Sequence, residues 1–253
     1  MPIYITGDLH GDFTRISDIG QRIGKGDYLI SLGDVGLILE AKPTIKERVA
    51  IGRIKRKGYT FVFISGNHDN EDRLNDYPVS EWCGGKAHII SRKRDGIPSI
   101  VHMMRGQVYS IENKRIFAFG GSEPHEKNIV VLDKKSPNFQ YEKTKLIEEG
   151  TFYRVKGVDY WESCLASEEE MQEGFANLCK VNHSVDYVVS HCAPTSVQNI
   201  IYGDTSWSNR QTEYLQRVAA NTNYNKWFFA HYHCNCKYEN GLFECVYDNV
   251  IQL

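Results

Sequence analysis

The sequence lacks any long hydrophobic run, since no stretch approaches the roughly 20 apolar residues that a membrane-spanning helix needs. Its first residues, MPIYITGDLHGD, turn polar after five positions, so an apolar segment of signal-peptide length is also missing there. We therefore expect no membrane partner and a cytoplasmic location.

The seven cysteines show no disulfide framework, because they are odd in number and irregularly spaced. Such spacing favours reduced thiols in an intracellular compartment. Neither positive nor negative charge is in large excess, since the formal net charge is -2. This balance argues against broad electrostatic binding, so we expect no strong nucleic-acid binding.

The 253 residues, of which 41% are hydrophobic and 25% charged, are sufficient to bury a full core. In the first third, β-branched and aromatic runs predict strands over residues 2–6, 27–33 and 59–65. Helical patterns separate them, near residues 13–23 and 43–57. This βαβαβ order favours a mostly parallel sheet that is covered by helices.

After residue 88 the pattern changes to short strands with a hairpin turn at Asn113, and a second α/β portion follows. The predicted fold class is therefore α/β (α+β), with two mixed β-sheets in a sandwich flanked by helices, in a single domain over residues 1–253. The expected strands are 88–90, 99–103, 107–111, 115–121, 186–190, 227–230, 242–247 and 250–253, and the expected helices are 167–180 and 209–222.

Residues 123–162 do not follow this alternation. They are rich in Lys, Glu and Tyr and are far longer than an ordinary connection. Such an insertion is typical either of a lid over a site or of a mobile surface arm, and the sequence leaves both open.

Five of the predicted strands end in turns that carry metal-binding types of residue. Ligands of open α/β sheets gather at the carboxyl ends of the strands, so we expect these turns to converge in one crevice. The candidate metal ligands are Asp8, His10, Asp34, Asn67, His191, His231 and His233.

Carboxylate, amide and imidazole ligands together favour manganese, iron or zinc over calcium, and the missing thiolates argue against a structural zinc site. The set is large enough for two divalent ions if one carboxylate bridges them, and Asp34 is the natural bridge. Manganese is the first choice, with iron, zinc, nickel and magnesium open. A competing local zinc clip within HYHCNC lacks the usual Cys-x-x-Cys spacing; it would use His231, His233, Cys234 and Cys236.

The order Asp-x-His, Gly-Asp, Gly-Asn-His-Asp, a lone His and a late His-x-His resembles the calcineurin-like metallophosphoesterase superfamily. The stretches GNHDNEDRLNDYPVSEWCGGKAH, HMMRGQVYSI, FGGS and DYVVSHCAPTSV are similar to its small bacterial and phage phosphoesterases. The resemblance covers most of the chain except the insertion.

The resemblance also implies roles for individual residues. His68 would be the unliganded histidine that protonates the leaving oxygen, with Asp69 placed to orient it. One ion would be held by Asp8, His10, Asp34 and His233, and the other by Asp34, Asn67, His191 and His231.

The sequence departs from the family pattern after Asp34. GDVGLI lacks the Asp-Arg-Gly of the protein-phosphatase branch: Leu37 stands in place of the acid, and Ile38 in place of the arginine that grips phosphate. Arg73 and Arg105 are candidates for that contact, because guanidinium forks suit phosphate. A further departure, Ala230, stands where glycine is usual before His-x-His.

The predicted function is two-metal hydrolysis of a small phosphate ester, by in-line attack of a hydroxide that bridges the two ions. The substrate would be a phosphodiester or a phosphomonoester, such as a nucleotide. The alternatives are a phosphoprotein phosphatase or nuclease with the same dimetal centre, and a non-catalytic binding module that retains the fold. The sequence gives no indication of the oligomeric state.

Overall fold

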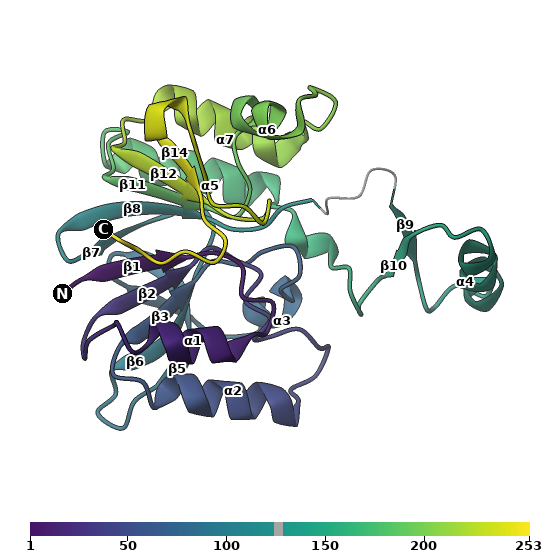
Figure 1. Ribbon diagram of the computed structural model, residues 1–253, viewed down its shortest axis with the longest axis horizontal. Helices are drawn as coiled ribbons and strands as arrows, with labels where there is room; N and C mark the ends of the chain where they lie inside the picture. Colours follow the sequence, from purple (N-terminus) through teal and green to yellow (C-terminus); the bar gives the residue numbers. More distant parts are fainter. Residues whose placement is uncertain (124–128) are drawn as a thin grey trace.

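The computed structural model describes residues 1–123 and 129–253 of the chain. In this part, two mixed sheets pack face to face, and helices cover their outer surfaces (Figure 1). The predicted fold class is therefore confirmed. No helix among the described residues is long and apolar enough to cross a membrane.

The first sheet has seven strands in the order β15-β1-β2-β3-β6-β5-β4. Its centre is parallel, as the βαβαβ pattern predicts, because β1, β2, β3 and β6 run in one direction. Antiparallel strands flank this centre on both sides. The strands are β1 (Ile3–Thr6), β2 (Tyr28–Ser31), β3 (Thr60–Phe63), β4 (Val79–Trp82), β5 (Gly85–Arg92), β6 (Pro98–Met103) and β15 (Ile251–Gln252).

The second sheet has six strands in the order β13-β14-β12-β11-β8-β7. The hairpin predicted at Asn113 is confirmed, since the strands on either side of it pair antiparallel from Ile111 and Lys114 outward. The strands are β7 (Gln107–Ile111), β8 (Lys114–Phe119), β11 (Tyr187–Ser190), β12 (Lys226–Phe229), β13 (Cys236–Tyr238) and β14 (Phe243–Cys245).

The main core lies between the two sheets and joins side chains such as Ile30 and Val62 of the first to Val189 and Phe228 of the second. A separate apolar cluster packs the outer face of each sheet against helices. These helices are α1 (Phe13–Ile19) and α2 (Ile45–Lys55) on the first sheet, and α5 (Glu168–Lys180), α6 (Thr195–Tyr202) and α7 (Arg210–Asn221) on the second (Figure 1).

Helix α6 was not predicted from the sequence, although its signals are present. It begins directly after Pro194 and ends at Gly203, whose φ of 65° suits glycine. The short helix α3 (Glu71–Asn75) is capped by the side chain of Asn70. Both elements lie next to strand ends that carry candidate metal ligands, where polar residues interrupt the helical pattern.

Residues 129–162 form a projecting unit that leaves the body of the molecule on the side of the strand ends (Figure 1). Its strands β9 (Val130–Leu132) and β10 (Tyr153–Val155) pair in parallel around helix α4 (Phe139–Glu148). Helix α4 buries no residue, so it is not packed into either core. Residues 124–128 of the predicted insertion lie outside the described residues, and its role as a lid or an arm stays a prediction.

Candidate metal centre

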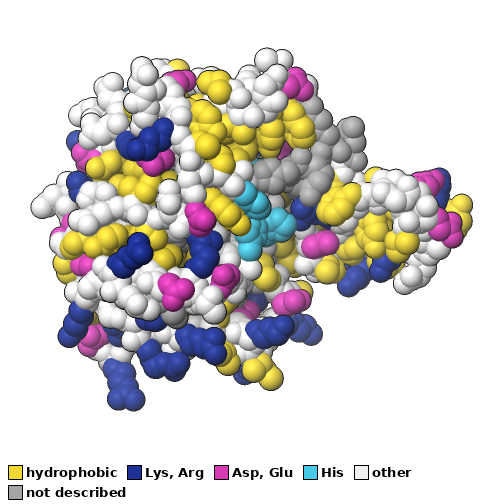
Figure 2. Space-filling view, viewed as in Figure 1, with side chains coloured by type: hydrophobic (Ala, Val, Ile, Leu, Met, Phe, Trp, Pro, Cys, Tyr) yellow, Lys and Arg dark blue, Asp and Glu magenta, His cyan; other side chains and the backbone are white. Residues whose placement is uncertain are grey.

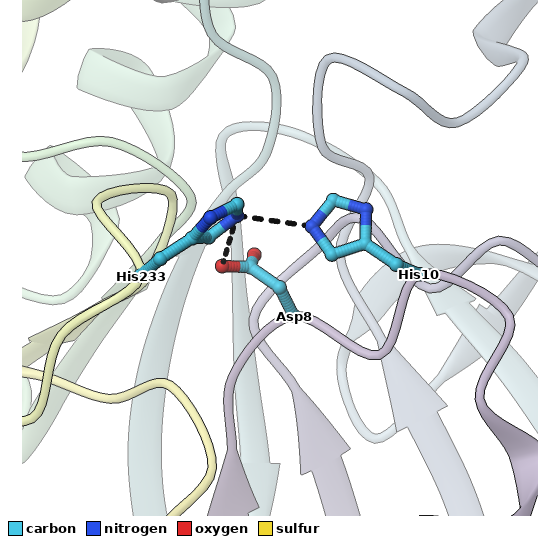
Figure 3. A group of neighbouring side chains, drawn as sticks. All are labelled: Asp8, His10 and His233. Carbon is cyan, nitrogen blue, oxygen red and sulfur yellow. Dashed lines mark hydrogen bonds and ion pairs between the residues drawn. The ribbon is translucent and has the colours of Figure 1, made fainter.

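Six of the seven candidate ligands come together in two groups of three at the carboxyl ends of the strands. Within each group, one ligand atom from every residue lies within 4.8 Å of the others. Figure 3 shows the first group, and its residue His233 lies in the loop after β12 of the second sheet. The groups are Asp8, His10 and His233, and Asp34, His191 and His231.

The first group has the spacing of ligands around one ion. His10 Nε2 lies 3.0 Å from His233 Nε2, and the latter atom lies 3.6 Å from Asp8 Oδ2. Ligand atoms about 2.0–2.2 Å from a shared metal ion are about 3–3.5 Å from one another. The two imidazole rings thus present their nitrogens to the same point, which suits a cation between them.

The second group is buried, and a hydrogen bond fixes the orientation of its central histidine. His191 Nδ1 donates to the Leu32 carbonyl at 2.7 Å, so in the neutral imidazole the lone pair of Nε2 is directed into the centre. His191 Nε2 lies 3.4 Å from Asp34 Oδ2 and 3.3 Å from Asn67 Oδ1. The amide oxygen of Asn67 therefore lies beside this group, at the place where the predicted fourth ligand would be.

The two groups meet at Asp34. Its Oδ2, besides lying 3.4 Å from His191 Nε2, is 4.0 Å from His10 Nε2 of the first group. The same oxygen thus faces ligands of both groups, which is the position that a bridging carboxylate needs.

The buried carboxylates make the centre electrostatically suited to cations. Burial raises the pKa of Asp8 to about 7. Burial disfavours a charged His191, but Asp34 and Asp8 outweigh this and raise the pKa of His191 to about 9. Burial also opposes ionisation of Asp34, yet His191 and the backbone N–H of His68 hold its pKa well below the usual range.

Several candidate ligands lie on strained backbone at the strand ends. His10, Asp34, His231 and His233 have φ values of 46°, 45°, 70° and 50°, in the left-handed region that favours glycine. Such conformations persist where the surrounding structure imposes them, and they are frequent at functional sites.

Gly66 permits a close approach between two of these turns. A Cβ atom at this position would collide with the backbone nitrogen and the carboxylate of Asp34. Only glycine therefore allows the turn after β3 to pack against the carboxylate of Asp34.

His68 lies beside the centre, as predicted, with its ring centroid 5.4 Å from that of His10. The described hydrogen bonds of Asp69 go elsewhere. Its carboxylate accepts the backbone N–H groups of Val35 at 3.2 Å, Gly36 at 3.0 Å and Gly66 at 2.9 Å. These contacts favour a role in joining the turns after β2 and β3 over the predicted role of orienting His68.

The two arginines predicted to bind phosphate have other partners. Arg73 forms a two-pronged ion pair with Glu47, with N–O distances of 2.7 and 2.9 Å. Arg105 is buried and lies 3.2 Å from both Glu71 and Glu170. In the described part of the chain, neither arginine contacts a residue of the two ligand groups.

A different arginine, Arg154, was not predicted from the sequence; β10 brings it from the projecting unit. Its Nη1 lies 3.4 Å from His68 Nδ1. The only available signal was a cation within the short apolar run TFYRV of the insertion. The competing zinc clip is not supported, because His231 and His233 belong to different groups, and neither group found among the described residues contains a cysteine.

Carboxylate and imidazole groups at the strand ends of a sandwich of two mixed sheets are an arrangement that suits a metal-dependent hydrolase. A family model described as calcineurin-like phosphoesterase matches residues 1–235, so the chain belongs to that family. The resemblance seen in the sequence is thereby confirmed.

The similarity to individual solved structures is low. The solved structures that resemble the chain include a phosphopantetheinyl hydrolase from Mycobacterium tuberculosis, with 15% identity and a TM-score of 0.49 over 97% of this chain and 89% of that one. Another is a putative 5'-nucleotidase from Staphylococcus aureus in complex with alpha-ketoglutarate, with 13% identity and a TM-score of 0.48. That alignment covers 99% of this chain and 50% of the nucleotidase chain. A search of curated proteins gives no match.

Proposed function

We propose that the protein hydrolyses a small phosphate ester with the help of two divalent ions, manganese first among them. The observation that carries this proposal is the position of Asp34, whose Oδ2 faces His191 Nε2 at 3.4 Å and His10 Nε2 at 4.0 Å. One carboxylate between two ligand groups is the arrangement that a dinuclear centre requires.

The bound ions would activate a water molecule and neutralise charge on the phosphoryl group. The exposed ligands His10 and His233 have side-chain exposures of 36% and 46%, so the centre is open to an ester on this side. In the proposed reaction His68, beside His10, gives a proton to the leaving oxygen, a contribution of roughly 10²–10⁴-fold.

The alternative of a phosphoprotein phosphatase has less support. Ile38, at the position where that branch of the family carries its arginine, is apolar and 1% exposed. A nuclease is disfavoured by the net charge of -2. We propose a small ester as the substrate, and the cytoplasm as its compartment, in line with cysteines that are all free.

The test is hydrolysis of p-nitrophenyl phosphate and bis-p-nitrophenyl phosphate by the manganese-loaded protein. Asn67→Ala should abolish most of the turnover, because it removes a ligand. Asn75→Ala, at an exposed position at the end of α3, is the matched control and should keep it. The proposal fails if neither ester is hydrolysed with manganese, iron, zinc, nickel or magnesium.

A further inference from the structure

One side chain connects the projecting unit to the metal centre. Arg154 on β10 is only 7% exposed, and its Nη1 approaches His68 Nδ1 to 3.4 Å. Figure 2 shows a patch of histidine side chains on the surface near the root of this unit. The insertion therefore places a positively charged side chain beside the centre.

The guanidinium is held in place by the turn that follows β10. Arg154 Nη1 donates to the carbonyl of Asp159 at 3.2 Å, and the carboxylate of Asp159 accepts the backbone N–H of Val155 at 2.5 Å. Val155 and Trp161, 7% and 5% exposed, anchor this turn. Arg154 is thus supported by its own segment, so its position does not depend on α4.

A cation at this point lies near the atoms that react. If His68 protonates the leaving oxygen, a group within hydrogen-bond distance of His68 is close to the phosphoryl group that carries that oxygen. Guanidinium is always charged and only donates hydrogen bonds, and its planar fork matches phosphate oxygens. Arg154 therefore has both the chemistry and the location to bind a phosphoryl oxygen.

Other arginines around the centre are used for structural contacts. Arg15 donates to the backbone carbonyls of Asp8 at 2.5 Å and Tyr247 at 2.9 Å. Arg73 and Arg105 pair with glutamates, as described above. Within residues 1–123 and 129–253, Arg154 is the arginine whose side chain contacts the side chain of a proposed catalytic residue.

We propose that Arg154 binds a non-bridging phosphate oxygen and thereby makes the protein selective for phosphomonoesters. This inference rests on the proposed function and adds the class of ester to it. A monoester has three non-bridging oxygens and a diester has two. Two bound ions would neutralise two of these oxygens, so an oxygen left for Arg154 would be present only in a monoester.

The experiment compares the manganese-loaded wild type with Arg154→Ala, Arg154→Lys and the control Lys156→Ala. Lys156 follows β10, is exposed and pairs with Glu162, so its loss removes a positive charge from the same segment. Steady-state kinetics on p-nitrophenyl phosphate and bis-p-nitrophenyl phosphate give kcat and KM. Calorimetry with inorganic phosphate measures oxyanion binding without turnover.

Arg154→Ala should lower kcat/KM for the monoester by about 10- to 100-fold and weaken phosphate binding by a similar factor, as expected for a lost charged hydrogen bond. The loss of kcat/KM for the diester should be several-fold smaller. For Arg154→Lys, kcat/KM for the monoester should lie between the values for wild type and Arg154→Ala, since lysine keeps the charge and lacks the planar guanidinium. Added guanidinium ion should restore part of the activity of Arg154→Ala, and Lys156→Ala should resemble wild type.

Equal losses on both esters with unchanged phosphate binding would overturn the inference, because Arg154 would then act on His68 alone. Unchanged monoester kinetics in Arg154→Ala would overturn it as well. A wild type that hydrolyses neither ester would contradict the proposed function instead. The phosphate calorimetry would still decide whether Arg154 binds the oxyanion.

Discussion

The backbone N–H of His68 donates to Asp34 Oδ1 at 2.8 Å. This bond joins the turn after β3, which carries the proposed proton donor, to the turn after β2, which carries the proposed bridging carboxylate. The other oxygen of Asp34 faces His191. Any shift of the β3 turn is therefore transmitted directly to the metal centre.

Gly66→Ala should disrupt this junction. The added Cβ would collide with Asp34, so the carboxylate must move out of the position between the two groups. We expect a loss of at least one bound manganese ion and of most hydrolysis. Elemental analysis of dialysed protein measures the metal content.

Gly52→Ala is the matched control for this glycine. Gly52 lies within α2. Outside the backbone of the helix, the nearest neighbour of an added Cβ atom would be the side chain of Arg56 at 4.0 Å, so a methyl group fits there. Alanine should stabilise the helix by about 0.5–1 kcal/mol. If Gly66→Ala binds as much manganese as Gly52→Ala, the close approach to Asp34 is not essential for the centre.

Asp69→Ala should destabilise the fold strongly. It would leave three backbone N–H groups without their carboxylate, those of Val35, Gly36 and Gly66. Each unsatisfied buried donor costs about 1–3 kcal/mol, so the free energy of unfolding should fall by roughly 3 kcal/mol or more. Urea unfolding measures this change. A loss below about 1 kcal/mol would show that water replaces the carboxylate.

The strands and most of the metal centre were predictable because both depend on local patterns. The runs around Ile30 and Val62 are mostly apolar and buried, as in parallel strands that are covered on both faces. The ligand motifs follow such runs directly, and parallel strands bring their carboxyl ends to one edge. Spacing was therefore sufficient to predict that the turns of Asp34 and His191 converge in one crevice, whereas their grouping around one ion came from the resemblance to the family.

Contacts between residues far apart in the sequence could not be predicted in this way. Arg105 looked available for phosphate, yet Glu170, 65 positions away, pairs with it. Arg154 reaches His68 across 86 positions, by way of an insertion whose fold has no periodic signal. The partner of a charged side chain depends on tertiary packing, so a sequence motif identifies candidates and leaves their roles open.

The two ligand groups predict a stoichiometry of two ions per chain. His10→Ala should lose the ion of the exposed group and keep most of the other, since Asp34 and the buried His191 remain. His183→Ala, outside both groups, should retain two ions. Elemental analysis after dialysis against manganese is the measurement, and full occupancy in His10→Ala would contradict the assignment.

Acid should destabilise the protein through two neighbouring histidines of the first sheet, His88 and His102. His88 and His102 are fully buried and lie side by side, with their Nδ1 atoms 3.1 Å apart. Burial lowers the pKa of both below 6.5: Glu71 partly opposes this for His88, while His88 and Arg105 add to it for His102.

Because these folded-state pKa values lie below that of the unfolded chain, the unfolded state binds more protons as the pH falls through about 6.5. The free energy of unfolding therefore has its full value above this pH and falls as the pH drops below it. His102→Gln removes one of the two titrating groups, so between pH 7 and 5.5 wild type should lose about 1 kcal/mol more than the variant. Urea unfolding at the two pH values measures the difference. Equal losses would mean that His102 accepts a proton in the folded state as easily as in the unfolded chain.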